Sequence, residues 1–452
     1  MNISFLHDLL NTVMKRQPGT GPRRREGGAD HTQLRALCDR LLASDGEASS
    51  IALARQALDL YDQLDGTGRA RFFGALARHY GPDRDTIREC YTRYTKDPNS
   101  DTARALFHAC EPPRQELLRR LNLAHGGTYD LVRMRADLQP LLGDNRELKA
   151  VDGDFVHLFS SWFNRGFLVL RRVDWNTPAA ILEKIIRYEA VHEIRDWDDL
   201  QRRLKPGDRR CFAFFHPAIG DEPLIFVEVA LTRGIPRGIQ PILEGHAAGF
   251  ADPSQADTAA FFGISNCQAG LQRISFGNFL IKQVVQELKR ELPQLKRFVT
   301  LSPVPGFARW LDAVRGDPGS IPDRESRDTL ALLDQPGWPQ DADKAERLRE
   351  TIMPLAARYL LEEKDRRGRP ADPVARFHLR NGARLHRINW LGDRSAKGMR
   401  QALGLMVNYL YVVDEIESNH ERHVAEGTVV SSAEVRKLAR AARGVARIEE
   451  SK

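Results

Sequence analysis

A glycine-flanked loop near the middle of the chain combines residue types that can bind a phosphate group. Gly270 and Gly277 flank the basic stretch LQRIS, and fourteen residues without Gly or Pro begin at residue 279. Glycine lets backbone N–H groups approach a ligand closely, and the first N–H groups of a helix are free to bind an anion. Arg273 adds a positive charge. The loop before an ordinary helix has the same pattern, so this alternative remains open. The loop contains neither a Walker motif nor a G-x-G-x-x-G motif, so neither ATP nor NAD is indicated as its ligand.

Ser302 is a second candidate, because it directly follows the apolar run RFVTL in the stretch TLSPVPGF. A serine before proline is usually a turn residue, and the two prolines stiffen this exit. However, Ser302 is expected at the same strand-end level as the loop above. Its hydroxyl is therefore placed where it can meet the reactive end of a bound ligand.

A third stretch, RFHLRNGARLHRINW, contains His378 and His386. Their separation of eight residues is not the i, i+4 spacing of a metal pair, and no acidic third ligand is suitably placed, so we reject a metal site. A lone histidine on a helix is usually structural. The arginines of this stretch wind around the helix without an aromatic stacking stripe, which argues against a nucleic-acid face; they are Arg376, Arg380, Arg384 and Arg387.

The elements that must position these residues form one predicted βαβ unit. A strand over 259–265, the loop, a helix over 279–292 and a strand over 298–301 follow one another. Such a unit requires a parallel strand pair with a right-handed crossover. Ligands of open α/β sheets bind where the strands end and the crossover begins, which favours the phosphate interpretation of the loop. Hairpin-like strands after residue 162 make the predicted sheet mixed.

The remainder of the chain is predominantly helical in pattern. Apolar stripes with a helical period run through residues 31–159, and helices dominate again from Gly306 onward. We therefore predict two domains, a helical one over 1–159 and a mixed-sheet one over 160–452. The first lacks glycine-rich loops and clustered polar residues, so a scaffolding or oligomer-forming role fits it better than catalysis.

Composition restricts the class of protein. The 452 residues are 42% hydrophobic and 29% charged, as in a soluble globular protein. No apolar run reaches the roughly 20 residues of a membrane span, and no secretory signal is recognisable at the start. The net charge of +7 favours a polyanionic partner, either nucleic acid or a phosphorylated cofactor. The five scattered cysteines have no disulfide or metal spacing, which fits a reducing cytosol; they are Cys38, Cys90, Cys110, Cys211 and Cys267.

Several long motifs together resemble malonyl-CoA decarboxylases over most of residues 160–410. The resemblance is carried, in this order, by NRGFLVLRRVDWNTPAAILEKI, EPLIFVEVALT, ISNCQAGLQRISFGNFLIKQVVQELKRELPQL, LSPVPGF and DPVARFHLRNGARLHRINWLGDRSAKGM. It implies an α+β protein with a helical N-terminal domain used in oligomer assembly and a catalytic domain similar to the GCN5-related acetyltransferase fold. It also implies a coenzyme A site, and a homo-oligomer that is a dimer or a tetramer.

The same resemblance assigns the candidate site residues. Ser302 matches the family's catalytic serine and His378 its catalytic histidine. The family's malonyl-CoA-binding loop corresponds to Gln272, Arg273, Ile274, Ser275, Phe276, Gly277 and Asn278. We therefore expect decarboxylation of malonyl-CoA to acetyl-CoA and CO₂. His378 is expected to donate a proton to the enolate, and Ser302 to position the malonyl carboxylate or to accept a proton.

No cofactor or metal is expected, because the coenzyme A thioester is itself the electron sink for the departing CO₂. The chain departs from animal-type members of the family at two positions. It carries Gly263 in place of a serine, and Ser275 in place of a glutamate thought to orient the histidine. Glu228, in the strand FVEVALT, is a candidate replacement for that glutamate on polarity alone. The C-terminal sequence EESK is not a peroxisomal signal, so a cytoplasmic enzyme is expected.

Three other functions remain open from the sequence. An acetyl-CoA-dependent acyltransferase of the same fold would need an acceptor groove and a base for an amine. A basic nucleic-acid-binding protein would need its charge clustered, whereas here the charge is spread along the chain. A non-catalytic assembly protein would bind coenzyme A without releasing CO₂.

Overall fold

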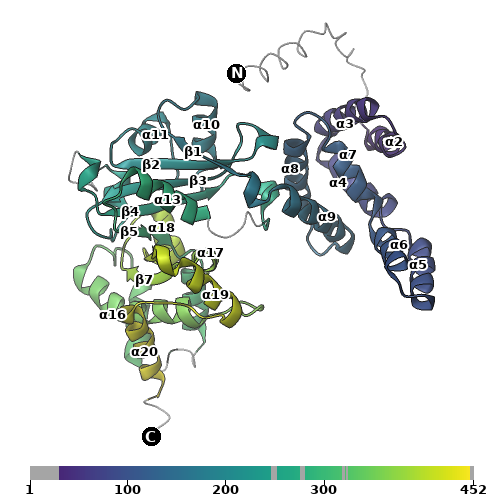
Figure 1. The fold of residues 1–452 in the computed structure, drawn as a ribbon. Helices are drawn as coiled ribbons and strands as arrows, with labels where there is room; N and C mark the ends of the chain where they lie inside the picture. The colour runs from purple at the N-terminus through teal and green to yellow at the C-terminus, as the bar shows by residue number, and fades with distance from the viewer. Residues whose placement is uncertain (1–29, 246–251, 275–279, 318–320, 322–323, 448–452) are drawn as a thin grey trace. The chain divides into compact units, whose positions relative to one another are not determined.

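The structure is a computed structural model that describes residues 30–245, 252–274, 280–317, 321 and 324–447. The chain divides into two compact units, Met1–Phe155 and Val156–Lys452 (Figure 1). The division falls inside helix α9 (Arg146–Trp162), as does the boundary at residue 159 expected from the sequence. Among the described residues, no helix has the length and apolar character needed to cross a membrane.

The first unit is helical. Asp30 and Asp83 cap the first turns of two helices, because each carboxylate accepts a hydrogen bond from a backbone N–H that has no partner inside the helix. Tyr61, Phe72 and Phe73 form an aromatic cluster in its core. Besides the first part of α9, its α-helices are α2 (His31–Leu42), α3 (Glu47–Asp62), α4 (Gly66–His79), α5 (Arg84–Lys96), α6 (Ser100–Cys110), α7 (Pro113–Leu121) and α8 (Gly127–Leu138).

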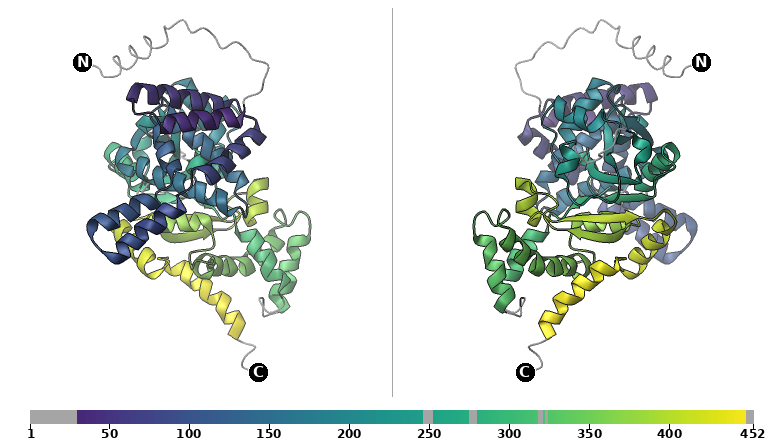
Figure 2. Two further views of the ribbon diagram at one scale, coloured as in Figure 1. Left: turned by 90° about the vertical axis from the view of Figure 1, so that its right-hand side faces the viewer. Right: turned by 90° about the vertical axis from the view of Figure 1, so that its left-hand side faces the viewer.

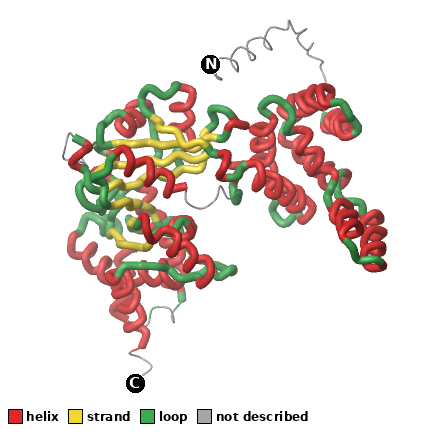
Figure 3. The backbone as a smooth tube through the Cα atoms, in the orientation of Figure 1, coloured by secondary structure: helices red, strands yellow, loops and turns green. Residues whose placement is uncertain are grey.

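The second unit is built on one eight-stranded mixed sheet, shown by the strands in Figure 3. The strand order is β1-β2-β3-β4-β5-β8-β6, and β7 also pairs with β8. Only β4 and β5 run parallel; the other pairs are antiparallel. The strands are β1 (Val169–Val173), β2 (Arg209–Phe215), β3 (Pro223–Thr232), β4 (Thr258–Asn266), β5 (Arg297–Thr300), β6 (Ser302–Pro303), β7 (Arg384–Asn389) and β8 (Met406–Tyr411). The expected α+β fold class, with a helical N-terminal region and a mixed sheet, is confirmed.

The predicted βαβ unit is present as β4, α13 (Leu280–Glu291) and β5. The parallel pairing extends only as far as Phe261 opposite Thr300. Beyond that point β4 continues to Asn266, whereas the chain after β5 passes into β6, which pairs with β8. The sheet therefore opens between β4 and β6. A bulge in the pairing of β3 with β4 adds one residue there and breaks the strict alternation of side chains.

Helices cover the sheet and continue beyond it. Helices α10 and α11 pack on the side of β2 that carries Cys211, Ala213 and Phe215. Helix α20 lies along α16, as Figures 1 and 2 show. The α-helices of this unit other than α13 are α10 (Ala179–Tyr188), α11 (Trp197–Leu204), α12 (Gln240–Leu243), α14 (Phe307–Gly316), α15 (Arg324–Leu330), α16 (Ala342–Glu362), α17 (Pro373–Arg380), α18 (Ala396–Ala402), α19 (Ile416–Glu426) and α20 (Ala433–Arg447).

Candidate active site

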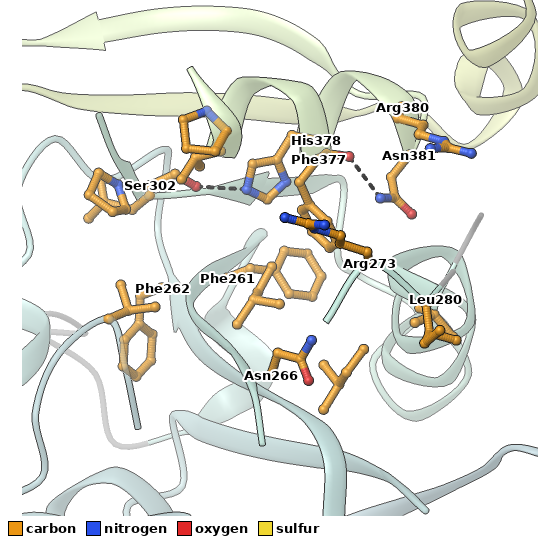
Figure 4. Close-up of a pocket in the computed structure, with 18 residues that line it drawn as sticks. Phe261, Phe262, Asn266, Arg273, Leu280, Ser302, Phe377, His378, Arg380 and Asn381 are labelled. Atoms are coloured by element: carbon orange, nitrogen blue, oxygen red, sulfur yellow. Dashed lines mark hydrogen bonds between the residues drawn. The ribbon is translucent and has the colours of Figure 1, made fainter. Parts of the chain in front are cut away.

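A cavity of about 470 Å³ lies where β4 and β6 separate. One wall is the second half of β4, and the other consists of the start of β6 and one side of α17 (Figure 4). Because of the β-bulge, Phe261 and Phe262 both line the cavity although they are sequence neighbours. Leu301 and Pro303 complete an apolar lining on the side of β6. The opening of the sheet therefore forms a pocket with largely apolar walls.

Ser302 and His378 meet on one wall of this cavity. Ser302 Oγ lies 3.0 Å from Nε2 of His378, and both side chains are buried. Ser302 is the first residue of β6. His378 is fixed by α17, whose first turn is capped by the Asp372 carboxylate through the N–H groups of Val374 and Ala375. The structure therefore brings together the serine and the histidine that the sequence analysis singled out.

Aromatic residues of β8 enclose the imidazole of His378. The hydroxyl of Tyr411 lies 2.9 Å from Nδ1, and the ring of Tyr409 stacks on the imidazole at a centroid distance of 4.7 Å and an angle of 24°. His378 is only 3% exposed. Burial lowers the pKa of His378 to about 3, because the apolar surroundings disfavour the charged ring. The imidazole by itself is therefore neutral over the physiological pH range.

The hydrogen bonds around the pair determine which ring nitrogen carries the proton. Ser302 donates its hydroxyl hydrogen to Thr300 Oγ1 at 2.9 Å, and Thr300 Oγ1 also accepts the backbone N–H of Tyr409 at 3.1 Å. With its hydrogen used in this way, Ser302 Oγ accepts from Nε2–H, and Nδ1 accepts from the Tyr411 hydroxyl. Burial raises the pKa of Tyr411, so this hydroxyl keeps its proton. The chain from Tyr411 to Thr300 thus points the imidazole proton at Ser302.

The charged residues that line the cavity are cationic. Arg273 and Arg380 line it together with Asn266 and Asn381, and none of the described lining residues is acidic. Neither guanidinium has an acidic partner within the described part of the chain. Arg273 has a left-handed backbone with a φ of 68°, which is uncommon for a residue with a side chain. The cavity is therefore arranged to receive an anionic ligand that is partly apolar.

The predicted binding loop is only partly described. Arg273 and Ile274 line the cavity, and so does Leu280, the first residue of α13. Gln272 is exposed and is not part of the lining. The remaining four predicted residues, Ser275, Phe276, Gly277 and Asn278, lie outside the described residues.

The suggestion that Glu228 orients the histidine is wrong. Glu228 is buried on β3, where both of its carboxylate oxygens lie 3.3 Å from Nη1 of Arg203. Burial raises the pKa of Glu228 to about 8, and Arg203 opposes that shift. A side chain at Gly263 would collide with the same carboxyl, because a Cβ there would lie 2.3 Å from its Oε2. The group on Nδ1 of His378 is the hydroxyl of Tyr411 instead.

Sequence reasoning missed Tyr411, Tyr409 and Thr300. Their local patterns are those of ordinary strands, and no short-range spacing links them to His378. The stretch MVNYLY, which is buried at every position, contains both tyrosines. Two tyrosines in a fully buried strand indicate that their hydroxyl groups need hydrogen-bond partners, but the pattern does not identify those partners.

A buried serine–histidine pair on the wall of a cavity is typical of an enzyme active site. Comparison with known proteins also indicates an enzyme and identifies its class. Residues 80–163 match the family model "Malonyl-CoA decarboxylase N-terminal domain", and residues 166–448 match "Malonyl-CoA decarboxylase C-terminal domain". The chain belongs to the malonyl-CoA decarboxylase family and is an enzyme of the carboxy-lyase class.

Individual relatives agree with the family assignment. Mitochondrial malonyl-CoA decarboxylase of the goose Anser anser anser is 36% identical over 402 residues, which cover 82% of this chain and 79% of the relative. A crystal structure of malonyl-CoA decarboxylase from Rhodopseudomonas palustris matches at 54% identity with a TM-score of 0.87, covering 90% of this chain and 99% of that one. One from Agrobacterium vitis also matches at 54% identity, with a TM-score of 0.85 and the same coverage.

Proposed function

We propose that this protein converts malonyl-CoA to acetyl-CoA and CO₂, with His378 as the proton donor and Ser302 beside it at the reacting end of the substrate. The observation that carries the proposal is the 3.0 Å contact between Ser302 Oγ and His378 Nε2 on the wall of a cavity that is also lined by two arginines. The family assignment supports the reaction type.

The cationic side of the cavity suits the coenzyme A moiety. Arg273 and Arg380 offer guanidinium groups that have no acidic partner among the residues that the structure describes. A guanidinium binds phosphate oxygens in a bidentate manner. The start of α13 reaches the cavity at Leu280. Free N–H groups at a helix start attract a phosphate further. The diphosphate is therefore placed at this end, and the acyl group extends towards Ser302.

The apolar side of the cavity suits loss of CO₂. Phe261, Phe262, Leu301 and Pro303 surround the space next to Ser302 and provide no cation for a carboxylate. A malonyl carboxylate there loses much of its hydration, whereas neutral CO₂ leaves without such a penalty. The electrons of the breaking C–C bond pass into the thioester carbonyl and form an enolate. No further electron sink is required, so the absence of a cofactor remains part of the proposal.

The enolate must then be protonated at its α-carbon. Burial by itself lowers the pKa of His378 to about 3, but a carboxylate beside the ring raises it again by favouring the charged form. Entry of the substrate thus increases the protonated fraction of the imidazole. Before the C–C bond breaks, the Ser302 hydroxyl turns from Thr300 to hold the carboxyl end. Nε2 then gives up its hydrogen bond to Ser302 Oγ and delivers that proton to the α-carbon.

An assay with malonyl-CoA as sole substrate tests the proposal. The wild type should release CO₂ and acetyl-CoA in equal amounts, and His378→Asn and Ser302→Ala should lower kcat by roughly 10²–10⁴-fold. Exposed positions provide controls: His108→Asn and Ser418→Ala should leave kcat unchanged. Near-normal decarboxylation by His378→Asn, with unchanged substrate affinity, would contradict its role. Acetyl-CoA turnover that needs an added amine would indicate an acyltransferase instead.

The expected assembly follows from the family resemblance, and the expected location from the scattered cysteines and the C-terminal sequence. We expect a homo-oligomer, a dimer or a tetramer, formed through the helical region. The cytoplasm is the expected compartment, although several curated relatives are named as mitochondrial. Sedimentation of the purified protein, and fractionation of cells that contain it, test these two expectations.

A further inference from the structure

Near the imidazole of His378 lie buried polar atoms that the proposed reaction does not use. Tyr409 stacks its ring on the imidazole, and its side chain is fully buried. The Tyr409 hydroxyl has no hydrogen-bond partner among the described residues, and neither does Oδ2 of Asp372. Buried polar atoms are nearly always paired, so two unpaired ones beside a catalytic residue require an explanation.

The Asp372 carboxylate is near enough to the Tyr409 hydroxyl to affect it electrostatically. Burial raises the pKa of the Tyr409 hydroxyl, and the charge of the Asp372 carboxylate raises it further, more than any other neighbouring group. The phenol of Tyr359 lies near the same carboxylate: a Cβ on Gly306 would lie 2.3 Å from its hydroxyl and 3.8 Å from Oδ2 of Asp372. Burial raises the pKa of Asp372 as well, although hydrogen bonds from the backbone N–H groups of Ala375, Gly306 and Val374 oppose the shift.

Tyr409 is also connected to Ser302, the other member of the catalytic pair, through Thr300. Its backbone N–H donates to Thr300 Oγ1, which in turn accepts the hydroxyl hydrogen of Ser302. Asp372 has a comparable double position, because its Oδ1 caps the helix that carries His378 while its Oδ2 is buried without a hydrogen-bond partner among the described residues. A displacement of either residue therefore moves both the ring of His378 and its surroundings.

We propose that Asp372 and Tyr409 are positioning residues for the catalytic pair, joined by a buried hydrogen-bonded link in which one internal water bridges the Tyr409 hydroxyl and Asp372 Oδ2. An internal water typically makes two to four hydrogen bonds to buried polar groups, and Tyr359 offers a third partner. The link holds the Tyr409 ring flat against the imidazole and so keeps Nε2 directed at Ser302. This inference rests on the proposed function of His378.

Tyr409→Phe and Asp372→Ser test the link, since each removes one end of it. Serine preserves the N-cap of α17, and phenylalanine preserves the stacked ring. Each variant should lower kcat about five- to tenfold, the effect of one lost hydrogen bond, with KM changed less than about twofold. The double variant should be no worse than either single one. Asp372→Asn keeps both an N-cap and a polar group towards the water, so it should recover most of the activity.

Matched substitutions elsewhere separate positioning from stability. Tyr61→Phe removes a buried hydroxyl that donates to Asp137, and Asp341→Ser changes the N-cap of α16. Tyr61→Phe should lower the melting temperature, Asp341→Ser should change it little, and neither should change kcat. Wild-type kcat in folded Tyr409→Phe or Asp372→Ser would overturn the link, as would losses that add in the double variant. If Tyr409→Phe does not fold, the kcat values of Asp372→Ser and Asp372→Asn test the link. Equal values for these two variants would overturn it.

The outcome is distinguishable from a failure of the proposed function. If His378→Asn is inactive and Tyr409→Phe is fully active, the link between Tyr409 and Asp372 is disproved, but the proposed function is not. An active His378→Asn removes the basis of both.

Discussion

Oγ of Ser302 lies 3.0 Å from Nε2 of His378, although 76 positions separate the two residues in the chain. The contact depends on β8, which pairs with β6 on the side of Ser302 and with β7, the strand that follows the helix of His378. β8 also contributes Tyr409 and Tyr411 to the surroundings of the imidazole. One strand therefore aligns both halves of the pair and sets the environment of the histidine.

Tyr411→Phe should lower kcat about tenfold, because Nδ1 of His378 loses the hydroxyl that keeps the proton on Nε2. KM should change little, since Tyr411 does not line the cavity. Steady-state kinetics with malonyl-CoA checks both values. Tyr80→Phe, in the helical unit, is the control. It likewise removes a tyrosine hydroxyl, in this case one that donates to Asp39, but it should not affect kcat. An unaltered kcat in Tyr411→Phe would mean that the tautomer is set by another group.

Binding of a malonyl-CoA analogue should take up part of a proton near pH 5 and much less at pH 7, because one neighbouring charge raises a pKa by roughly 1–3 units. The pKa of His378 is lowered to about 3 by burial, and an anionic group beside the ring raises it. Sulfoacetyl-CoA carries a sulfonate that cannot leave as CO₂, so it suits calorimetry in buffers of different ionisation enthalpy. Acetyl-CoA should give no uptake, and His378→Asn should abolish it with either ligand. Equal uptake by wild type and His378→Asn would place the proton on another group.

Acid should destabilise the wild type more than His378→Gln. The pKa of His378 is lowered from 6.5 to about 3, so the unfolded chain binds this proton more readily than the folded one. The stabilising contribution of the neutral imidazole is therefore complete above pH 6.5 and is lost as the pH falls towards 3. The free energy of unfolding of the wild type should decrease by about 2 kcal/mol more than that of the variant between pH 6.5 and pH 5. Urea unfolding at the two pH values measures this difference, and parallel losses would contradict the buried neutral histidine.

Arg380→Ala should raise KM for malonyl-CoA roughly fivefold and leave kcat nearly unchanged, because an exposed ion pair contributes up to about 1 kcal/mol to binding. Arg273→Ala should behave alike, since both guanidinium groups line the cavity without an acidic partner in the described part of the chain. Raised ionic strength should reduce both effects. Arg366→Ala is the control, because this exposed arginine is not part of the cavity lining. A large fall in kcat with unchanged KM would assign the arginines to the reaction itself.

Gly382→Ala should lower the free energy of unfolding by more than about 2 kcal/mol through backbone strain and a steric clash. Gly382 has a φ of 82°, and a Cβ there would lie 2.0 Å from the carbonyl oxygen of Ile416. Gly368→Ala is a matched control: its φ is 74°, but no atom lies within 4 Å of the added carbon. It should cost only about 1 kcal/mol, the strain of the left-handed backbone. Chemical denaturation compares the two, and similar losses would show that the clash has no effect.

Much of the local structure was predictable from the sequence. Apolar runs bounded by Gly and Pro predicted β4 and β5, and the uninterrupted stretch between them predicted α13. Asp372 and Pro373 predicted the start of α17, since a capping carboxylate and a proline at the first position are signals within a few residues of each other. The family resemblance then named Ser302 and His378, but residue types alone favoured a turn serine and a structural histidine.

The environment of the site was not predictable, as Glu228 shows most clearly. Its polarity in an apolar strand signalled a special position, but the sequence does not say which neighbour a strand side chain will meet. In the structure Glu228 pairs with Arg203. Nδ1 of His378 instead forms a hydrogen bond with the hydroxyl of Tyr411.

The sequence by itself determined the elements and their ends, because capping, turn formation and apolar periodicity act between residues a few positions apart. Only the tertiary structure decided which side chains share the cavity. The parallel pairing of β4 and β5 stops at Phe261 and Thr300, and β8 brings Ser302, Tyr409 and Tyr411 around the imidazole. These contacts join segments separated by tens of residues and are selected by the packing of the whole sheet. The same burial that selects them makes His378 neutral, which no pattern of neighbouring residues specifies.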